Sequence, residues 1–304
     1  MILSALWLPA TLFAALFQAW RTALQQRLRG QLSVNAAGLV RYLYGVLPGA
    51  LILGAYVVAV GAALPSVGMD FLAWAAIGGL LQIIATNLLI MAFGHRNFTV
   101  GTAYSKTEAM QGAVLALIVL GEALSAMAWT GIAVGVFGVL VLSLAGRVPN
   151  FKDLLAATVQ PAALCGLAAG FFFALASVAI KGATLRVPTD DLVLRALVTL
   201  VVTNVLQTIM QGGWMAWREP AGLKAAFLSW RNSAWVGALS ACGSACWFTG
   251  FACAPVALVR SVGQIEVIFT LLFSRFLLRE ALSRAEIIGT LVVVAGVILV
   301  LVGR

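Results

Sequence analysis

Two glutamates stand inside long apolar stretches, where a carboxylate is unusual. Glu108 lies in YSKTEAMQGAVLALIVLGEALS, residues 104–125, and Glu266 lies in VGQIEVIFTLLFSRFLLREALS, residues 262–283. An ionised carboxylate at bilayer depth costs at least about 2.5 kcal/mol on translocon scales, so such a group is normally paired, neutralised or exposed to a water-filled cavity. A carboxylate in that setting can bind an ammonium group or exchange a proton.

Further polar residues accompany the two glutamates along the predicted helices. Helical spacing places Tyr104, Glu108 and Gln111 on one face, which predicts a polar stripe able to line a cavity. The other candidate binding residues are basic, amide or aromatic side chains within apolar segments: Lys106, Gln264, Trp20, Trp247, Asn87, Asn204, Arg21 and Arg41.

Each candidate also has a structural interpretation. The glutamates can instead pair with basic residues of neighbouring helices, for which Lys106, Arg21, Arg41, Arg195 and Arg260 are available. Arginines near the ends of apolar segments can snorkel to the membrane interface. Aromatic side chains can pack, and asparagines can bond to a neighbouring helix rather than to a ligand. Pairing and cavity lining do not exclude each other, because a pair that opens and reforms can take part in both.

The elements that carry these residues must be membrane helices. The chain has 304 residues, of which 62% are hydrophobic and 10% are charged, and its mean hydropathy is +1.05. A soluble protein cannot solvate such a surface. The apolar runs are long and do not alternate, so they predict helices rather than barrel strands. Ten spans are predicted, at residues 3–24, 36–60, 70–93, 98–120, 127–145, 161–183, 190–211, 232–252, 256–278 and 284–303.

The two halves of the chain repeat each other. An offset of 158 places Glu108 on Glu266 and Glu122 on Glu280. It carries five further identities without a gap: Ala123 on Ala281, Leu124 on Leu282, Ser125 on Ser283, Gly131 on Gly289, and Gly138 on Gly296. Duplication explains this, and predicts repeats at residues 1–148 and 149–304. Because each repeat holds five spans, the second enters the membrane from the opposite side, and such inverted repeats commonly house a solute site near the bilayer midplane.

The two segments GEALSAMAWTGIAVGVFGVLVLSL and REALSRAEIIGTLVVVAGVILVLVG resemble the EamA-type repeats of the drug/metabolite transporter superfamily. The resemblance covers nearly the whole chain. It implies an all-α integral membrane protein with ten transmembrane helices in two inverted five-helix repeats, around a central cavity. It also implies movement of small organic solutes or lipid-linked intermediates, often as export.

Several residues are assigned to architecture rather than to a site. Glu122 and Glu280 stand at helix ends, where a carboxylate can cap a helix or meet interfacial water. His95, the only histidine, lies in a polar break and is interpreted as a surface residue. The four cysteines fall in apolar segments without neighbouring metal ligands, so we expect small apolar packing and no metal or other cofactor.

The distribution of basic residues predicts an orientation. The odd connections between predicted spans hold eleven Lys and Arg, whereas the even connections and both termini hold three. The positive-inside rule then puts the odd connections in the cytoplasm and both termini outside, opposite to the orientation expected from the family resemblance. The net charge of +9 is thus a topology signal and does not indicate nucleic acid as a partner.

The sequence therefore predicts a secondary transporter in a bacterial cytoplasmic membrane, with export expected. The solute would be an amine, an amino acid or a related cationic or zwitterionic metabolite, moved by alternating access, with proton coupling as an open option. The alternative is a translocase of a lipid-linked intermediate or lipid headgroup. The chain has no P-loop or hydrolase motif, so an enzyme is not expected. The expected partners are the solute, membrane lipid and H+, and either a monomer or a homodimer is compatible with ten helices.

Overall fold

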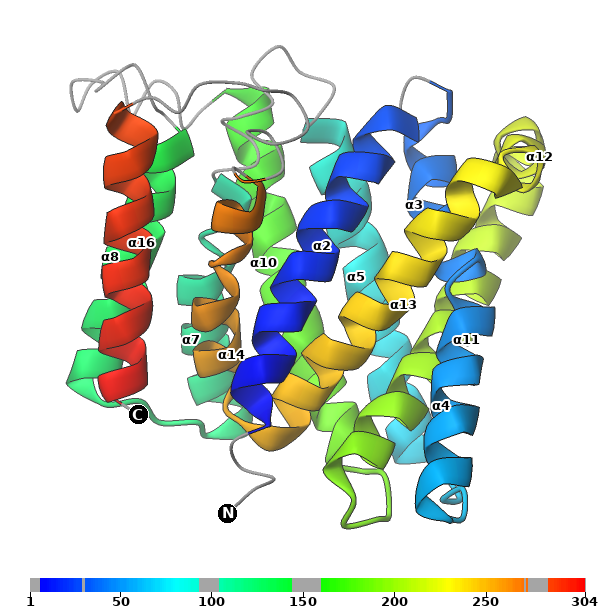
Figure 1. Cartoon of the computed structure of the whole chain (residues 1–304). Coiled ribbons are helices and arrows are strands. Elements are labelled where there is room, and N and C mark those ends of the chain that lie inside the picture. The colour runs from blue at the N-terminus through cyan, green and yellow to red at the C-terminus, as the bar shows by residue number, and fades with distance from the viewer. Residues whose placement is uncertain are drawn as a thin grey trace. The chain divides into compact units, whose positions relative to one another are not determined.

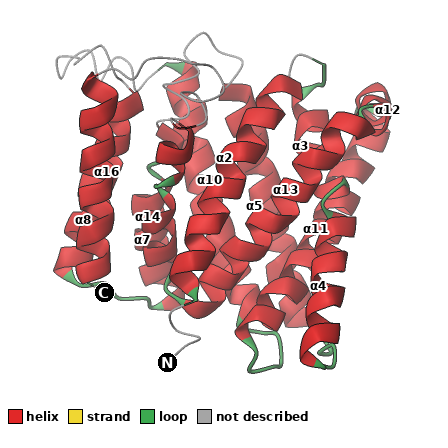
Figure 2. Cartoon of the chain, viewed as in Figure 1, coloured by secondary structure: helices red, strands yellow, loops and turns green. Residues whose placement is uncertain are grey.

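The computed structural model describes residues 6–28, 31–92, 104–143, 160–270, 272 and 284–303, and these ranges contain helices and connecting turns without strands (Figure 2). The described helices, labelled in Figure 1, are α2 Trp7–Leu28, α3 Val34–Leu43, α4 Val46–Val60, α5 Met69–Ala92, α7 Glu108–Leu120, α8 Ala126–Ser143, α10 Pro161–Thr184, α11 Leu192–Arg218, α12 Pro220–Leu228, α13 Trp230–Cys253, α14 Val256–Gly263 and α16 Arg284–Val302.

The predicted class, an all-helical membrane protein, is confirmed. Within the described ranges, five segments are long and apolar enough to cross a membrane: Val34–Val60, Met69–Ala92, Pro161–Thr184, Leu192–Arg218 and Trp230–Cys253. Three shorter apolar helices cover parts of further predicted spans, at Glu108–Leu120, Ala126–Val141 and Ile287–Val302. Every predicted span overlaps a described helix, but the number of ten crossings remains a prediction.

Two predicted segments have a different internal structure. The span expected at 36–60 is divided at Tyr44 and Gly45 into α3 and α4. The polar interruption expected after residue 211 is largely helical, because α11 continues to Arg218 and the short α12 follows at once. Pro220 begins α12, where its missing N–H costs nothing. Polarity in this stretch marks exposure rather than loss of helix.

The chain forms two compact units that do not coincide with its sequence halves. Unit 1 comprises Met1–Ile83 and Ala176–Ala254, and unit 2 comprises Ile84–Leu175 and Pro255–Arg304. The helices α5 and α10 each run from one unit into the other. Each unit therefore takes helices from both predicted repeats. Compactness does not report on duplication, so the repeats at 1–148 and 149–304 remain a prediction.

Unit 1 is organised around α11 and α13. The helix α13 packs along α2, and α11 packs against α3, α4 and α13. A buried apolar cluster joins α5, α10 and α11 through Phe71, Ala75, Ala183, Val187, Leu194 and Val198. Asp191 starts α11 by accepting hydrogen bonds from the backbone N–H groups of Val193 and Leu194, which satisfies donors that a helix start leaves open.

In unit 2, the closest helix contact joins α8 and α16, which lie side by side (Figure 1). Glycines permit this approach: a Cβ atom added to Gly131 would lie 2.6 Å from the Val300 nitrogen, and one added to Gly296 would lie 2.5 Å from the Gly135 nitrogen. Gly131 and Gly135 have small-xxx-small spacing, which favours such a contact because lipid offers no hydrophobic drive and close packing must supply the association.

Candidate functional site

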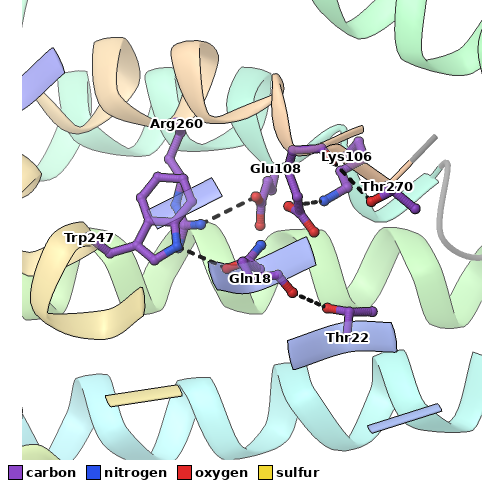
Figure 3. Close-up of polar contacts among 8 residues, drawn as sticks. Gln18, Thr22, Lys106, Glu108, Trp247, Arg260 and Thr270 are labelled. Carbon is purple, nitrogen blue, oxygen red and sulfur yellow. Dashed lines mark hydrogen bonds and ion pairs between the residues drawn. The ribbon is translucent and has the colours of Figure 1, made fainter. Parts of the chain in front are cut away.

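Both apolar-stretch glutamates form ion pairs within unit 2. The Glu266 carboxylate Oε2 lies 2.6 Å from Lys106 Nζ, and the Glu108 Oε1 lies 3.3 Å from an Arg260 guanidinium nitrogen. The four side chains are between 7% and 12% exposed. Figure 3 shows the two pairs as neighbouring contacts. The glutamates are therefore paired with basic residues, as the structural interpretation of the sequence allowed, and their partners are Lys106 and Arg260.

The two pairs connect α7 to the α14 segment, and so connect the two predicted repeats. Glu108 comes from the first repeat and takes its cation from the second, whereas Glu266 comes from the second and takes its cation from the first. The helices α7 and α14 pack on each other. Together the two pairs contain two positive and two negative groups. The four charges sum to zero, and each buried charge is compensated by its partner.

Each glutamate follows a tightened turn within its apolar segment. Before Glu108, the chain turns at Lys106 and Thr107, and before Glu266 it turns at Gln264 and Ile265. At an offset of 158 these turns occupy the same place in both repeats. Each turn interrupts a predicted span: α7 begins only at Glu108, within the span predicted at 98–120, and α14 ends at Gly263, within the span predicted at 256–278.

Hydrogen bonding accounts for the turns. The Thr107 N–H donates to the Tyr104 carbonyl, and the Gln264 N–H donates to the Ser261 carbonyl, both in the i to i−3 pattern of a tightened helix. The Thr107 hydroxyl also donates to the Tyr104 carbonyl at 2.7 Å, in competition with the normal helical donor. Because the turn lies between Tyr104 and Glu108, the predicted polar face holds only for Glu108 and Gln111.

Glycines of other helices pack against both turns. A Cβ atom on Gly170 of α10 would lie 2.8 Å from the Ser105 carbonyl oxygen, and one on Gly135 of α8 would lie 2.8 Å from the Gln264 amide oxygen. The absence of a side chain at these two positions therefore provides the room that the turns occupy. Irregular backbone in membrane proteins is tolerated where protein encloses it.

The segment EALS, residues 122–125 of the first predicted repeat, has a capping role. The Glu122 carboxylate accepts a 2.7 Å hydrogen bond from the N–H of Val256, the first residue of α14. Ser125 accepts from the Ala128 N–H at the start of α8 and donates to the Gly303 carbonyl. The loop that contains Glu122 and Ser125 begins at Gly121, whose φ of 69° suits glycine. Glu122 thus caps a helix of the other repeat, rather than the helix that follows it.

The remaining candidates in unit 2 lie near these groups to different degrees. Tyr104 is buried and precedes the first turn. Gln111 donates to the Thr107 hydroxyl at 2.8 Å, which ties its side chain to that turn. Asn87 is half-buried in α5. His95, Glu280 and Ser283 lie outside the described residues.

Unit 1 holds the other candidates, in surroundings of its own. Trp247 donates from its indole nitrogen to Gln18 Oε1 at 2.9 Å, and the Thr22 hydroxyl donates to the Gln18 carbonyl at 2.8 Å (Figure 3). Trp20, on the same helix as Gln18, is 49% exposed. Asn204 is buried, with its amide nitrogen against Gly45 at the junction of α3 and α4.

Arg21 and Arg41 are buried in unit 1, at 6% and 5% exposure. The Arg41 guanidinium carbon lies 5.4 Å from the centre of the Tyr42 ring. Neither side chain extends over the protein surface, as snorkelling to the interface would require. Their burial favours an internal role for both.

Unit 1 also contains a buried amide cluster that the sequence patterns above did not predict. Gln207 is fully buried, and its amide nitrogen donates to Gln82 Oε1 at 2.8 Å and to the Gly79 carbonyl at 3.2 Å. Tyr42 donates to the Gln82 carbonyl. Glutamines within apolar spans were the available signal. Among the described residues, no three His, Cys, Asp or Glu side chains gather in a way that could hold a metal ion.

The chain is similar to known proteins in sequence over its second half and in fold over its whole length. Residues 160–302 match the model of the EamA-like transporter family. No curated protein matches the chain. A solved structure described as "Crystal structure of protein" is similar over 100% of this chain and 97% of its own, with a TM-score of 0.70 and 17% sequence identity. At that identity the similarity concerns the fold. The second half of the chain is therefore similar to the EamA-like transporter family of the drug/metabolite transporter superfamily, in agreement with the resemblance of its sequence.

Proposed function

We propose that this membrane transporter moves a small cationic or zwitterionic amine, such as an amino acid or related metabolite, by alternating access without nucleotide fuel. The observation that carries the proposal is the pair of compensated carboxylates, each placed directly after a tightened turn at the same point of its repeat. Turns that interrupt membrane helices expose backbone and side-chain polar groups for solute binding in many transporters.

The chemistry follows from exchange of partners. A solute ammonium group can replace Lys106 at Glu266 or Arg260 at Glu108, because it offers a carboxylate the same charge and N–H donors. The longer Arg260 contact, at 3.3 Å, lies beyond the usual range of a charge-assisted hydrogen bond, so it should exchange more readily than the 2.6 Å Lys106 contact. A proton arriving at either carboxylate would also release its cation, which offers a route to proton coupling.

The test is uptake and counterflow in proteoliposomes with pooled amines and amino acids, with and without a pH gradient. We expect Glu108→Gln and Glu266→Gln to lose gradient-driven uptake by at least tenfold while the purified proteins remain folded. Asp190→Asn is the matched control, because that carboxylate is fully exposed and its nearest cation, Arg195, lies 3.8 Å away. Wild-type rates in both glutamate variants would reject these residues as the working carboxylates.

The alternative, transfer of a lipid-linked intermediate or headgroup, predicts a different result in the same preparation. Lipid translocation would persist with no counterflow of water-soluble amines or amino acids. Labelled lipid added to one leaflet measures this directly. Movement of lipid alone would replace the amine proposal.

A further inference from the structure

Gln264 is a buried amide for which the described residues supply no partner. It follows α14 at the second tightened turn and is 4% exposed. Within the part of the chain that the structure describes, neither its side-chain nitrogen nor its side-chain oxygen makes a hydrogen bond. Buried polar side chains in folded proteins are nearly always satisfied, and an unsatisfied one in an apolar setting opposes folding. Among the described residues, therefore, nothing satisfies the donor or the acceptor of this side chain.

Packing holds this amide in a defined place. Its oxygen lies against Gly135 of α8, where an added Cβ atom would be 2.8 Å away. Gly296 of α16 contacts the backbone of the same glycine. Three segments of unit 2 therefore meet at Gly135, and the amide oxygen packs against the backbone of this glycine.

Gln264 also stands between the two ion pairs along the chain. Arg260, one turn earlier, binds Glu108, and Glu266, two residues later, binds Lys106. At the repeat offset of 158, Gln264 is the counterpart of Lys106 itself. One repeat therefore places a cation at this position, and the other places a neutral group that can both donate and accept.

We propose that Gln264 is a specificity-determining residue that recognises the amino-carboxylate part of a zwitterionic solute, an inference that rests on the proposed function. Its amide nitrogen donates to the solute carboxylate, and its amide oxygen accepts from the solute ammonium group. A simple amine offers only donors and leaves the amide nitrogen unsatisfied, whereas an amino-carboxylate satisfies both atoms. A site that pairs with a polar substrate group discriminates against an analogue that lacks the group, because its own buried atoms then stay unpaired.

The test compares counterflow of amino acids with counterflow of the amines formed by their decarboxylation. Gln264→Met keeps the length of the side chain and removes both polar atoms, whereas Gln264→Glu keeps an acceptor and removes the donor. We expect the wild type to prefer amino acids, expressed as the ratio of the two KM values, and both variants to lose that preference by tenfold or more. Amine transport by Gln264→Glu should be retained.

Thermal unfolding gives a second measurement. Gln264→Met should unfold at the same temperature or a higher one, because it removes two unsatisfied atoms from a packed site, and amino acids should no longer raise its unfolding temperature. Primary amides such as amino acid amides serve as a further arm, since they test whether the carboxylate is required. Equal use of acids and amides by the wild type would reject the amino-carboxylate assignment.

The possible outcomes distinguish a failure of the Gln264 proposal from a failure of the proposed transport function. If the wild type transports amino acids and both variants keep its KM ratio, Gln264 does not determine specificity, and a buried water or tight packing accounts for it. If Gln264→Met fails to fold, Gln264→Glu alone decides between the two results. A wild-type protein that moves neither class overturns the proposed function, and this inference with it.

Discussion

At the scale of residues, the site consists of two buried ion pairs in which each charge is stabilised by its partner. Glu266 and Lys106 are 8% and 12% exposed, so neither has enough water to remain ionised cheaply without its partner. The same holds for Glu108 and Arg260. Each pair therefore stabilises the folded state described, and a solute or proton that opens a pair must compensate the charge that it leaves buried. This dependence is what couples occupancy of the site to the structure around it.

A double-mutant cycle on the shorter pair tests that dependence. Lys106→Met should destabilise the protein by about 3–5 kcal/mol, because it leaves a buried carboxylate unpaired. Lys106→Met combined with Glu266→Met should recover most of that loss, since no buried charge remains. The thermal unfolding midpoint in detergent measures both. A loss in the double variant equal to the sum of the losses in Lys106→Met and Glu266→Met alone would show that the pair does not couple energetically.

At the scale of elements, glycine contacts decide how closely the helices of unit 2 approach. The α8–α16 contact brings backbone against backbone at Gly131, where a Cβ atom would lie 2.6 Å from the Val300 nitrogen. Neither backbone can yield without a shift of the whole helix. Close packing of this kind also fixes Gly135, and through it the amide of Gln264. The packing of α8 on α16 therefore affects the position of the Gln264 side chain.

Gly131→Ala is expected to destabilise the protein by about 1–3 kcal/mol, the usual range for forcing an atom into a packed contact. Gly54→Ala is the matched control: Gly54 lies within α4, and an added Cβ atom there meets nothing within 4 Å. The control should gain up to about 1 kcal/mol from the better helix propensity of alanine. Unfolding midpoints of the two variants provide the comparison, and similar shifts in both would contradict the close contact.

At the scale of the whole molecule, the structure locates several of the basic residues that were counted for the orientation. Lys181, which was counted with an even connection, is buried within α10 and donates to the Ala254 carbonyl at 2.7 Å. By contrast, Arg218, Lys224 and Arg231 are exposed around α12. Arg218 stacks on Trp217 and Arg231 on Trp230, as basic and aromatic residues do at a membrane interface.

Orientation can be measured by cysteine labelling in intact cells, after replacement of the four native cysteines. We expect Lys224→Cys to be protected from a membrane-impermeant maleimide until the cells are opened, because the positive-inside rule places this region in the cytoplasm. Asp190→Cys, in the exposed turn before α11, should react in intact cells. The opposite pattern would place the termini in the cytoplasm, and transport assays would then need the reverse sidedness.

The amino-acid sequence by itself determined the class of the protein, the approximate position of its helices and the unusual status of Glu108 and Glu266. Long apolar runs suffice for this, because the bilayer requires about 20 residues per helix and penalises a carboxylate wherever it stands. The tertiary structure decided which cation each glutamate takes. Several arginines and lysines were available, and the chosen partners lie 152 and 160 residues away. It also decided where the helices turn, because Gly170 and Gly135 provide the room for those turns from other helices. Neither outcome is local, since each depends on the packing of segments that are distant in the chain.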